Sequence, residues 1–177
     1  ARQMGATCPI TMVPNGVDLE KFKVQSEKLK TITQNFKTII TTSRLVKKNG
    51  IDILIESLRF LPDNVRLQIL GTGPEEMSLK QLLSRRRLDS RVEFLGQVPP
   101  CEILNYLVQA DVFVRASRSE GLGNSFLEAM AAAVPVVGTP VGGIPDFLKG
   151  GALAGSKASP LVNQTGWFCE VDNPKSI

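Results

Sequence analysis

The sequence alternates between short apolar or β-branched runs and longer stretches with apolar residues at helical spacing, and this alternation is its strongest structural constraint. Between the runs, apolar residues recur every three or four positions, as in Ile51, Leu54, Ile55, Leu58 and Leu61. Repeated alternation of this kind predicts an α/β fold built on a Rossmann-like, doubly wound parallel sheet. The runs that are typical of strands are Lys37–Thr42, Val65–Leu70, Arg91–Leu95, Asp111–Val114 and Val136–Val137.

A glycine-containing loop and the helix expected after it carry the densest set of candidate functional residues. Residues 117–145 read SRSEGLGNSFLEAMAAAVPVVGTPVGGIP. This pattern places Glu120 in the loop and Glu128 about one turn into the helix, away from its apolar face. Pro135 is expected to close the helix, and Gly142-Gly143 predicts a second glycine turn.

The start of this helix is expected to bind a phosphate. Asn124 or Ser125 can cap the helix, because their side-chain oxygens accept hydrogen bonds from otherwise unpaired amides. The free amides and the positive end of the helix dipole form a seat for an anion, and glycine allows a ligand to approach the backbone closely. With an acid on either side, the loop predicts a sugar-nucleotide site, whereas glycoside hydrolysis is a poorer account of acids that bracket an anion seat. The candidate phosphate ligands are Gly121, Leu122, Gly123, Asn124 and Ser125.

The blocks SEGLGNSFLEAMA and PVVGTPVGGIPD, in this order, resemble the C-terminal, nucleotide-binding domain of retaining GT-B glycosyltransferases of family 4, the "glycosyl transferases group 1". The resemblance extends from about Val13 to Val171. It implies one half of a GT-B fold, in which residues 1–35 are a linker segment and residues 36–177 are a donor domain that is truncated at its C-terminus. It also implies that Glu128 accepts hydrogen bonds from the ribose hydroxyls, and that Glu120 contacts the transferred sugar and orients its anomeric carbon.

The loop after the first predicted strand resembles the G-R-L-x-x-x-K-G segment of this family, in which Arg and Lys grip the donor diphosphate. Arg44 matches the Arg, and the resemblance makes it a candidate catalytic cation that stabilises charge on the departing nucleoside diphosphate. Asn49 stands where Lys is usual. Lys48, one residue earlier, either replaces that Lys or faces the solvent.

Two further turns follow predicted strands at the edge where open α/β sheets bind ligands. The backbone of Gly71 or Gly73 can approach a ligand there, and Pro74 suits the first position of the next helix. The resemblance implies that the backbone around Val98 pairs with the nucleotide base. Farther along the chain, the composition of residues 150–160 is that of a flexible loop.

Composition and charge exclude several other classes of function. The net charge of +4 is modest and the basic residues are scattered, apart from Arg85–Arg87, so we expect no nucleic-acid partner. The three cysteines lack a CxxC pair, which argues against a disulfide framework or a zinc site and favours a reducing compartment. The chain contains no histidine and no Asp-x-Asp pair, and we expect neither a metal nor a cofactor. No apolar run approaches the ~20 residues that span a bilayer.

These observations and the resemblance predict the donor domain of a retaining glycosyltransferase that binds a nucleotide-sugar. We expect a cytoplasmic enzyme, with peripheral association at the inner membrane face as an option through an N-terminal GT-B domain. The isolated domain is expected to bind a nucleoside diphosphate weakly and to transfer no sugar, because the acceptor pocket belongs to the N-terminal half of a GT-B enzyme. A sugar-nucleotide epimerase of the same fold and a non-catalytic nucleotide-binding module, motivated by Asn49, remain alternatives.

Overall fold

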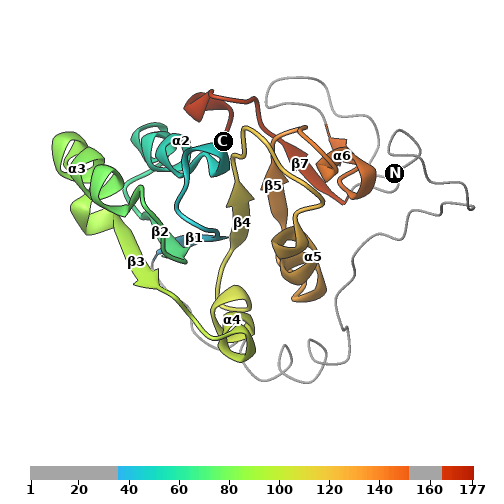
Figure 1. The fold of residues 1–177 in the computed structure, drawn as a ribbon. Helices are drawn as coiled ribbons and strands as arrows, with labels where there is room; N and C mark the ends of the chain where they lie inside the picture. Colours follow the sequence, from blue (N-terminus) through green and yellow to red (C-terminus); the bar gives the residue numbers. More distant parts are fainter. Residues whose placement is uncertain (1–35, 152–164) are drawn as a thin grey trace, which may run out of the picture.

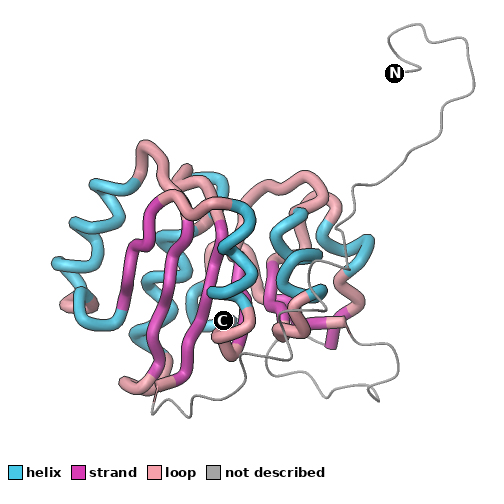
Figure 2. Tube along the Cα trace, turned by 90° about the horizontal axis from the view of Figure 1, so that it is seen from below, coloured by secondary structure: helices cyan, strands magenta, loops and turns pink. Residues whose placement is uncertain are grey.

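The computed structural model describes residues 36–151 and 165–177, and these residues form an open sheet with helices against both of its faces (Figure 1). Within them, seven strands pair in the order β3-β2-β1-β4-β5-β7-β6, and each pairing is parallel. Figure 2 shows the longer strands running side by side. The predicted Rossmann-like, doubly wound parallel sheet is therefore confirmed. The strands are β1 (Lys37–Thr42), β2 (Val65–Leu70), β3 (Val92–Gly96), β4 (Val112–Arg115), β5 (Val136–Gly138), β6 (Gly150–Gly151) and β7 (Gly166–Phe168).

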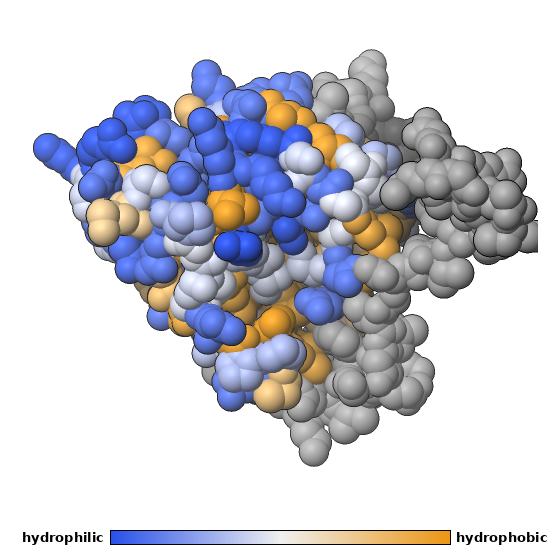
Figure 3. Space-filling view, in the orientation of Figure 1, coloured by the Kyte–Doolittle hydropathy of each residue, from blue (hydrophilic) through white to orange (hydrophobic). Residues whose placement is uncertain are grey.

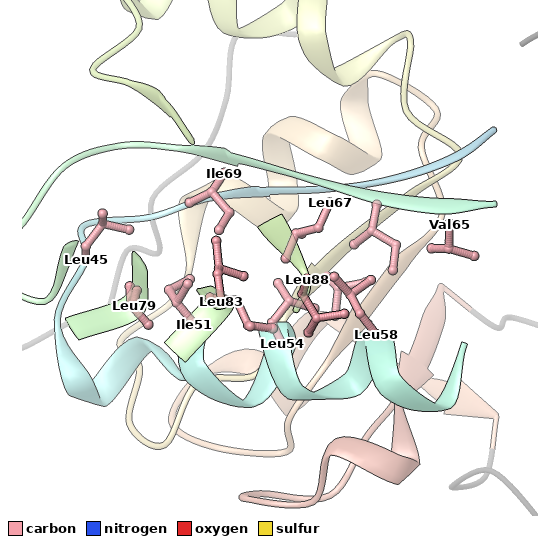
Figure 4. Packing of buried hydrophobic residues seen from close by; sticks show 13 residues of the cluster. Leu45, Ile51, Leu54, Leu58, Val65, Leu67, Ile69, Leu79, Leu83 and Leu88 are labelled. Atoms are coloured by element: carbon pink, nitrogen blue, oxygen red, sulfur yellow. The ribbon is translucent and has the colours of Figure 1, made fainter. Parts of the chain in front are cut away.

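The helices bury apolar side chains in two separate cores, one on each face of the sheet. Alternate residues of β1 point to opposite faces, so Ile39 belongs to one core and Ile40 to the other. In the first core, Leu54 packs with Leu67 and Ile69, which β2 directs toward it (Figure 4). The helical segments are α2 (Ile51–Ser57), α3 (Glu76–Arg86), α4 (Pro100–Leu107), α5 (Asn124–Ala131) and α6 (Ile144–Phe147), with 3-10 turns η2 (Lys47–Asn49), η3 (Leu58–Phe60), η4 (Asp89–Arg91) and η5 (Pro174–Ser176).

The second core lies under α4, α5 and α6. It contains Phe113 from β4 and Phe126 from α5, whose rings meet edge to face with centroids 5.2 Å apart. Because both rings are fully buried, they fix α5 against the sheet and so fix the loop that precedes it. The surface that Figure 3 shows is mostly polar, with small separate apolar patches.

Several boundaries differ from the sequence predictions; β4, for example, spans Val112–Arg115 rather than Asp111–Val114. Helix α3 begins at Glu76 rather than at Pro74, because Gly73 to Glu75 form a turn that bonds to the loop after β1. Arg91 belongs to η4 rather than to β3. Helix α5 ends at Ala131, because Ala133 takes a left-handed conformation (φ 58°), so Pro135 is not what stops it.

Another difference is at residues 150–151, which form β6 instead of the start of a loop. The rest of the predicted loop, and the predicted linker over residues 1–35, lie outside the described residues. Among the residues that the structure describes, none of the helices has the length and apolar character needed to cross a bilayer.

Candidate functional site

A pocket of about 810 Å³ opens at the carboxyl edge of the sheet. The ends of β1, β2 and β4 and the loop after β3 line it, and this is the edge at which open parallel sheets bind ligands. Four of the residues predicted from the sequence lie on its wall: Arg44, Lys48, Gly71 and Val98. The pocket wall does not include the other predicted site residues, which are Gly73, Glu120, Gly121, Leu122, Gly123, Asn124, Ser125 and Glu128.

The loop after β1 directs two basic side chains to the pocket. Arg44 and Lys48 are both exposed and both line it. Asn49, which stands at the family's usual Lys position, is buried with 3% of its surface exposed. Its side-chain amide donates to the carbonyl of Arg44 over 2.7 Å. Asn49 therefore shapes the backbone that carries Arg44, and Lys48 supplies the second positive charge on this side of the pocket.

Two glycines bring the loop after β2 against the loop after β1. Gly71 has a φ of 127°, and a Cβ there would lie 2.0 Å from the carbonyl oxygen of Ser43. A Cβ on Gly73 would lie 2.3 Å from the carbonyl oxygen of Leu45. Gly71 lines the pocket, whereas Gly73 serves the packing of the two loops. The spacing of the glycines thus has a structural cause that does not depend on a ligand.

Arg115 is the residue at this site that sequence reasoning missed. It ends β4, lines the pocket, and pairs with Glu120 through an Nη2–Oε2 distance of 2.8 Å. Both side chains are only 12% exposed. Burial lowers the pKa of the Arg115 guanidinium, and the charge of Glu120 opposes this effect. The signal in the sequence was a basic residue at the end of an otherwise apolar strand, five positions before Glu120.

Glu120 does not line the pocket but is linked to it by its ion pair with Arg115. Its carboxylate also accepts hydrogen bonds from the Ser117 hydroxyl at 3.3 Å and from the Gly121 amide at 3.1 Å. A Cβ on Gly123 would lie 3.4 Å from Glu120 Cγ, so this side chain lies against the start of α5. Glu120 is therefore a fixed carboxylate between the helix terminus and a cation on the pocket wall.

The prediction that Asn124 or Ser125 caps α5 is wrong. Gly123 occupies the cap position in a left-handed conformation, and no side chain caps the helix. The Ser125 hydroxyl instead accepts a hydrogen bond from Arg115 Nη1 at 2.7 Å. Within the described part of the chain, the amides of Asn124 and Ser125 make no hydrogen bond, so they remain available as donors at the positive end of the helix.

Glu128 lies on α5 and is partly buried, and no described residue supplies it with an ion pair or a hydrogen bond to its carboxylate. Burial raises the pKa of this carboxyl group. A partly desolvated acid without a partner lowers the stability of the fold when it ionises. Such a group is suited to accept hydrogen bonds from ligand hydroxyls.

We expect Glu128→Gln to stabilise the fold at neutral pH. Since the folded pKa exceeds the unfolded value, the native state holds more protons, and the stability contributed by Glu128 is lost as pH rises through the folded pKa. In urea unfolding, the advantage of the Gln variant should grow between about pH 4 and about pH 7.

Glu56→Gln is the matched control for this experiment. Burial raises the pKa of Glu56, but the hydrogen bonds from Arg86 and Arg59 outweigh it and lower the pKa overall. Its Gln variant should therefore lose stability relative to the unsubstituted chain as pH rises over the same range. An identical pH trend for the two variants would contradict the assignment of Glu128 as an unpaired acid.

No group of three His, Cys, Asp or Glu side chains that could hold a metal ion occurs in residues 36–151 and 165–177. Among the described residues, Arg44, Lys48 and Arg115 and the terminus of α5 supply positive charge at the site.

Comparison with known proteins identifies the family. A model of the family described as "Glycosyl transferases group 1" matches residues 36–177. The chain belongs to the glycosyl transferases group 1. Among curated members, a phosphatidylinositol N-acetylglucosaminyltransferase subunit from Arabidopsis thaliana is 36% identical over 143 residues, which are 78% of this chain and 31% of that protein. WcaL from Escherichia coli is 32% identical over 181 residues, which are 93% of this chain and 44% of WcaL.

Solved structures share the fold of this chain. HepE from Anabaena superposes with a TM-score of 0.77 at 24% identity, over 92% of this chain and 43% of HepE. The C-terminal domain of the group 1 protein LpcC from Francisella tularensis gives a TM-score of 0.67 at 24% identity, over 90% of this chain and 83% of that domain. The chain spans less than half the length of the curated relatives described above, and its fold is that of the C-terminal half of a GT-B glycosyltransferase.

Proposed function

We propose that this chain is the donor-binding domain of a retaining family 4 glycosyltransferase, and that a nucleoside diphosphate-sugar occupies the pocket at the carboxyl edge of the sheet. The observation that carries the proposal is the convergence on one pocket of Arg44, Lys48 and Arg115, with Arg115 paired to Glu120. Because Glu120 balances the charge of Arg115, the two free positive charges on the wall are those of Arg44 and Lys48, and they match the two negative charges of the diphosphate in a nucleotide-sugar. Membership of the group 1 family favours the same conclusion.

Each residue then has a role in binding or in transfer. Arg44 and Lys48 hold the diphosphate from the pocket wall. The free amides at the start of α5 lie outside that wall, next to Arg115, and in this proposal the diphosphate extends to them. As the diphosphate departs, these groups stabilise the growing negative charge without a metal ion or another cofactor. Glu128 accepts hydrogen bonds from the ribose, and Glu120 contacts the hydroxyls of the transferred sugar.

We propose uridine as the base. HepE has been crystallised with UDP and glucose and with UDP-glucose, and TarM from S. aureus with UDP. The backbone next to Val98 lies at the pocket, where it can meet the edge of a base. The acceptor would bind to an N-terminal GT-B domain, in a cytoplasmic enzyme that reaches the inner membrane face through that domain.

The alternative of a non-catalytic binding module rested on Asn49. Lys48 lines the pocket and supplies a positive charge next to that position, which favours a catalytic domain over such a module. The residues named above do not separate transfer from epimerisation of a sugar nucleotide. Incubation of the complete enzyme with a UDP-sugar would separate the two, because an epimerase converts the sugar in the absence of any acceptor.

Titration calorimetry with UDP, GDP and ADP tests the binding proposal. We expect UDP to bind most tightly, and Glu128→Ala and Arg44→Ala each to weaken binding by about tenfold or more, because each removes hydrogen bonds that involve a charged group. Lys47→Ala is the control, since Lys47 is an exposed neighbour of Lys48 that does not line the pocket.

Equal heats for the unsubstituted chain and the Glu128→Ala variant would remove the ribose role of Glu128. Sugar transfer by the 177-residue chain alone would contradict our expectation that the acceptor site lies in another domain.

A further inference from the structure

Arg118 connects the two sides of the donor pocket without lining it. It lies in the loop between β4 and α5, two residues before Glu120. Its backbone amide donates to the carbonyl of Lys48 at 2.7 Å, and its Nη1 donates to the carbonyl of Lys47 at 2.5 Å. One residue therefore holds both carbonyls of the turn that presents Lys48 to the pocket.

Two carboxylates in turn hold the Arg118 guanidinium in place. Asp52, in the first turn of α2, accepts from Nη1 at 2.9 Å and from Nη2 at 2.8 Å. Asp172, from the segment after β7, accepts from Nε at 2.6 Å. The hydrogen bonds to Asp52, opposed by partial burial, raise the pKa of Arg118, so it stays a cation. A planar fork that satisfies two acids and a carbonyl has a fixed orientation.

The acids come from parts of the chain that are distant in sequence. Asp172 has a left-handed backbone conformation with a φ of 57°, and its carboxylate reaches Arg118 from the C-terminal segment. That segment packs beside α2 through η5, as Figure 1 shows in red and cyan. The C-terminal segment is thereby linked, through Arg118, to the turn that carries Lys48.

We propose that Arg118 is a positioning residue of the donor site, which sets the Lys47–Lys48 turn against the Glu120 loop and transmits the placement of the C-terminal segment to the diphosphate seat. This inference rests on the proposed function for the identity of the ligand. Arg118 does not contact the donor. It acts through the backbone of Lys48, so its loss should weaken the grip on phosphate and leave the base site intact.

Hydrogen exchange tests the positioning role without any ligand. The amides of Asn49 and Gly50 donate to Val46 and Lys47 within the turn, at 3.0 and 3.3 Å. We expect Arg118→Lys to raise exchange at these amides by about tenfold, because an ammonium group cannot make the same set of bonds. Asp172→Asn changes an exposed partner and leaves the pair between Arg118 and Asp52 in place. It should raise the exchange rate at the same two amides by a smaller factor.

Arg91→Lys is the matched control. Arg91 also holds several backbone carbonyls, through Nε to Val65 at 3.1 Å and through Nη2 to Leu61 and Pro62 at 3.3 and 2.7 Å. These bonds lie where β2 begins, which is the end of that strand opposite to the pocket. Arg91→Lys should leave exchange at residues 49 and 50 unchanged.

Titration with UDP and with uridine separates positioning from a general loss of structure. Arg118→Lys should weaken UDP about tenfold, or about 1.4 kcal/mol, and leave uridine within about twofold. Equal weakening of both ligands, or unchanged exchange at residues 49 and 50, would overturn the inference. Failure of the unsubstituted chain to bind UDP would contradict the proposed function. It would leave the positioning role of Arg118 open to the hydrogen-exchange test, which needs no nucleotide.

Discussion

Arg115→Met is expected to destabilise the fold by about 3 kcal/mol and to loosen the candidate sugar-contacting acid at the same time. Arg115 and Glu120 form an ion pair in which each side chain is 12% exposed. Removing the cation leaves a carboxylate that is largely shielded from water with only the Ser117 hydroxyl and the Gly121 amide as donors. The free energy of unfolding in urea measures the loss.

Two further variants show whether the lost stability comes from breaking the ion pair between Arg115 and Glu120. Arg115→Met combined with Glu120→Gln should recover a large part of the loss, because no unpaired charge remains. Arg86→Met removes an exposed arginine and leaves Glu56 paired with Arg59, so it should cost less than about 1 kcal/mol. A double variant as unstable as Arg115→Met alone would show that Arg115 acts through packing and not through the charge of Glu120.

Arg115→Met also distinguishes contacts with the transferred sugar from contacts with the nucleoside diphosphate. If Glu120 contacts the transferred sugar, as we propose, Arg115→Met should reduce the extra affinity for UDP-glucose over UDP. The direct effect on UDP is expected as well, because Arg115 lines the pocket, so the ratio of the two affinities is the quantity to measure. An unchanged ratio would remove Glu120 from the sugar site.

Much of the fold could be predicted because strands and helices leave local signals. The β-branched run at Lys37–Thr42 and the helical spacing of Ile51 and Leu54 depend on neighbours in sequence, and both predictions were confirmed. The ends of elements were less predictable. Helix α5 stops at Ala131, before the predicted stop at Pro135, because Ala133 is left-handed, and an alanine gives no sequence signal of that conformation.

A site residue could be predicted from the sequence only where its own segment of the chain determines its position. Arg44 lies two residues after the end of β1, and its place on the pocket wall follows from where that strand ends. Ser125 was expected to cap α5, but Arg115 binds its hydroxyl from a neighbouring element, and nothing local to Ser125 shows this. The same holds for Arg118, whose bonds to Asp52 and Asp172 span 66 and 54 positions.

Gly142→Ala is expected to destabilise the fold by more than about 2 kcal/mol and to abolish nucleotide binding. Gly142 has a φ of 57°, and a Cβ there would lie 1.8 Å from the carbonyl oxygen of Glu120. The next amide, of Gly143, donates to the carbonyl of Gly121 at 2.7 Å. The added methyl group would therefore push the glycine turn away from the loop that carries Glu120, and that loop leads directly into α5.

Three alanine variants separate the causes of this loss. Gly121→Ala adds a Cβ with nothing within 4 Å and no positive φ, so it should be close to neutral. Gly96→Ala also meets nothing within 4 Å but has a φ of 69°, so it should cost only the left-handed backbone, about 1–2 kcal/mol. Gly142→Ala combines that backbone with the contact on Glu120. If it unfolds in urea at the same concentration as Gly96→Ala, the close approach of the two loops does not hold the Glu120 loop in place.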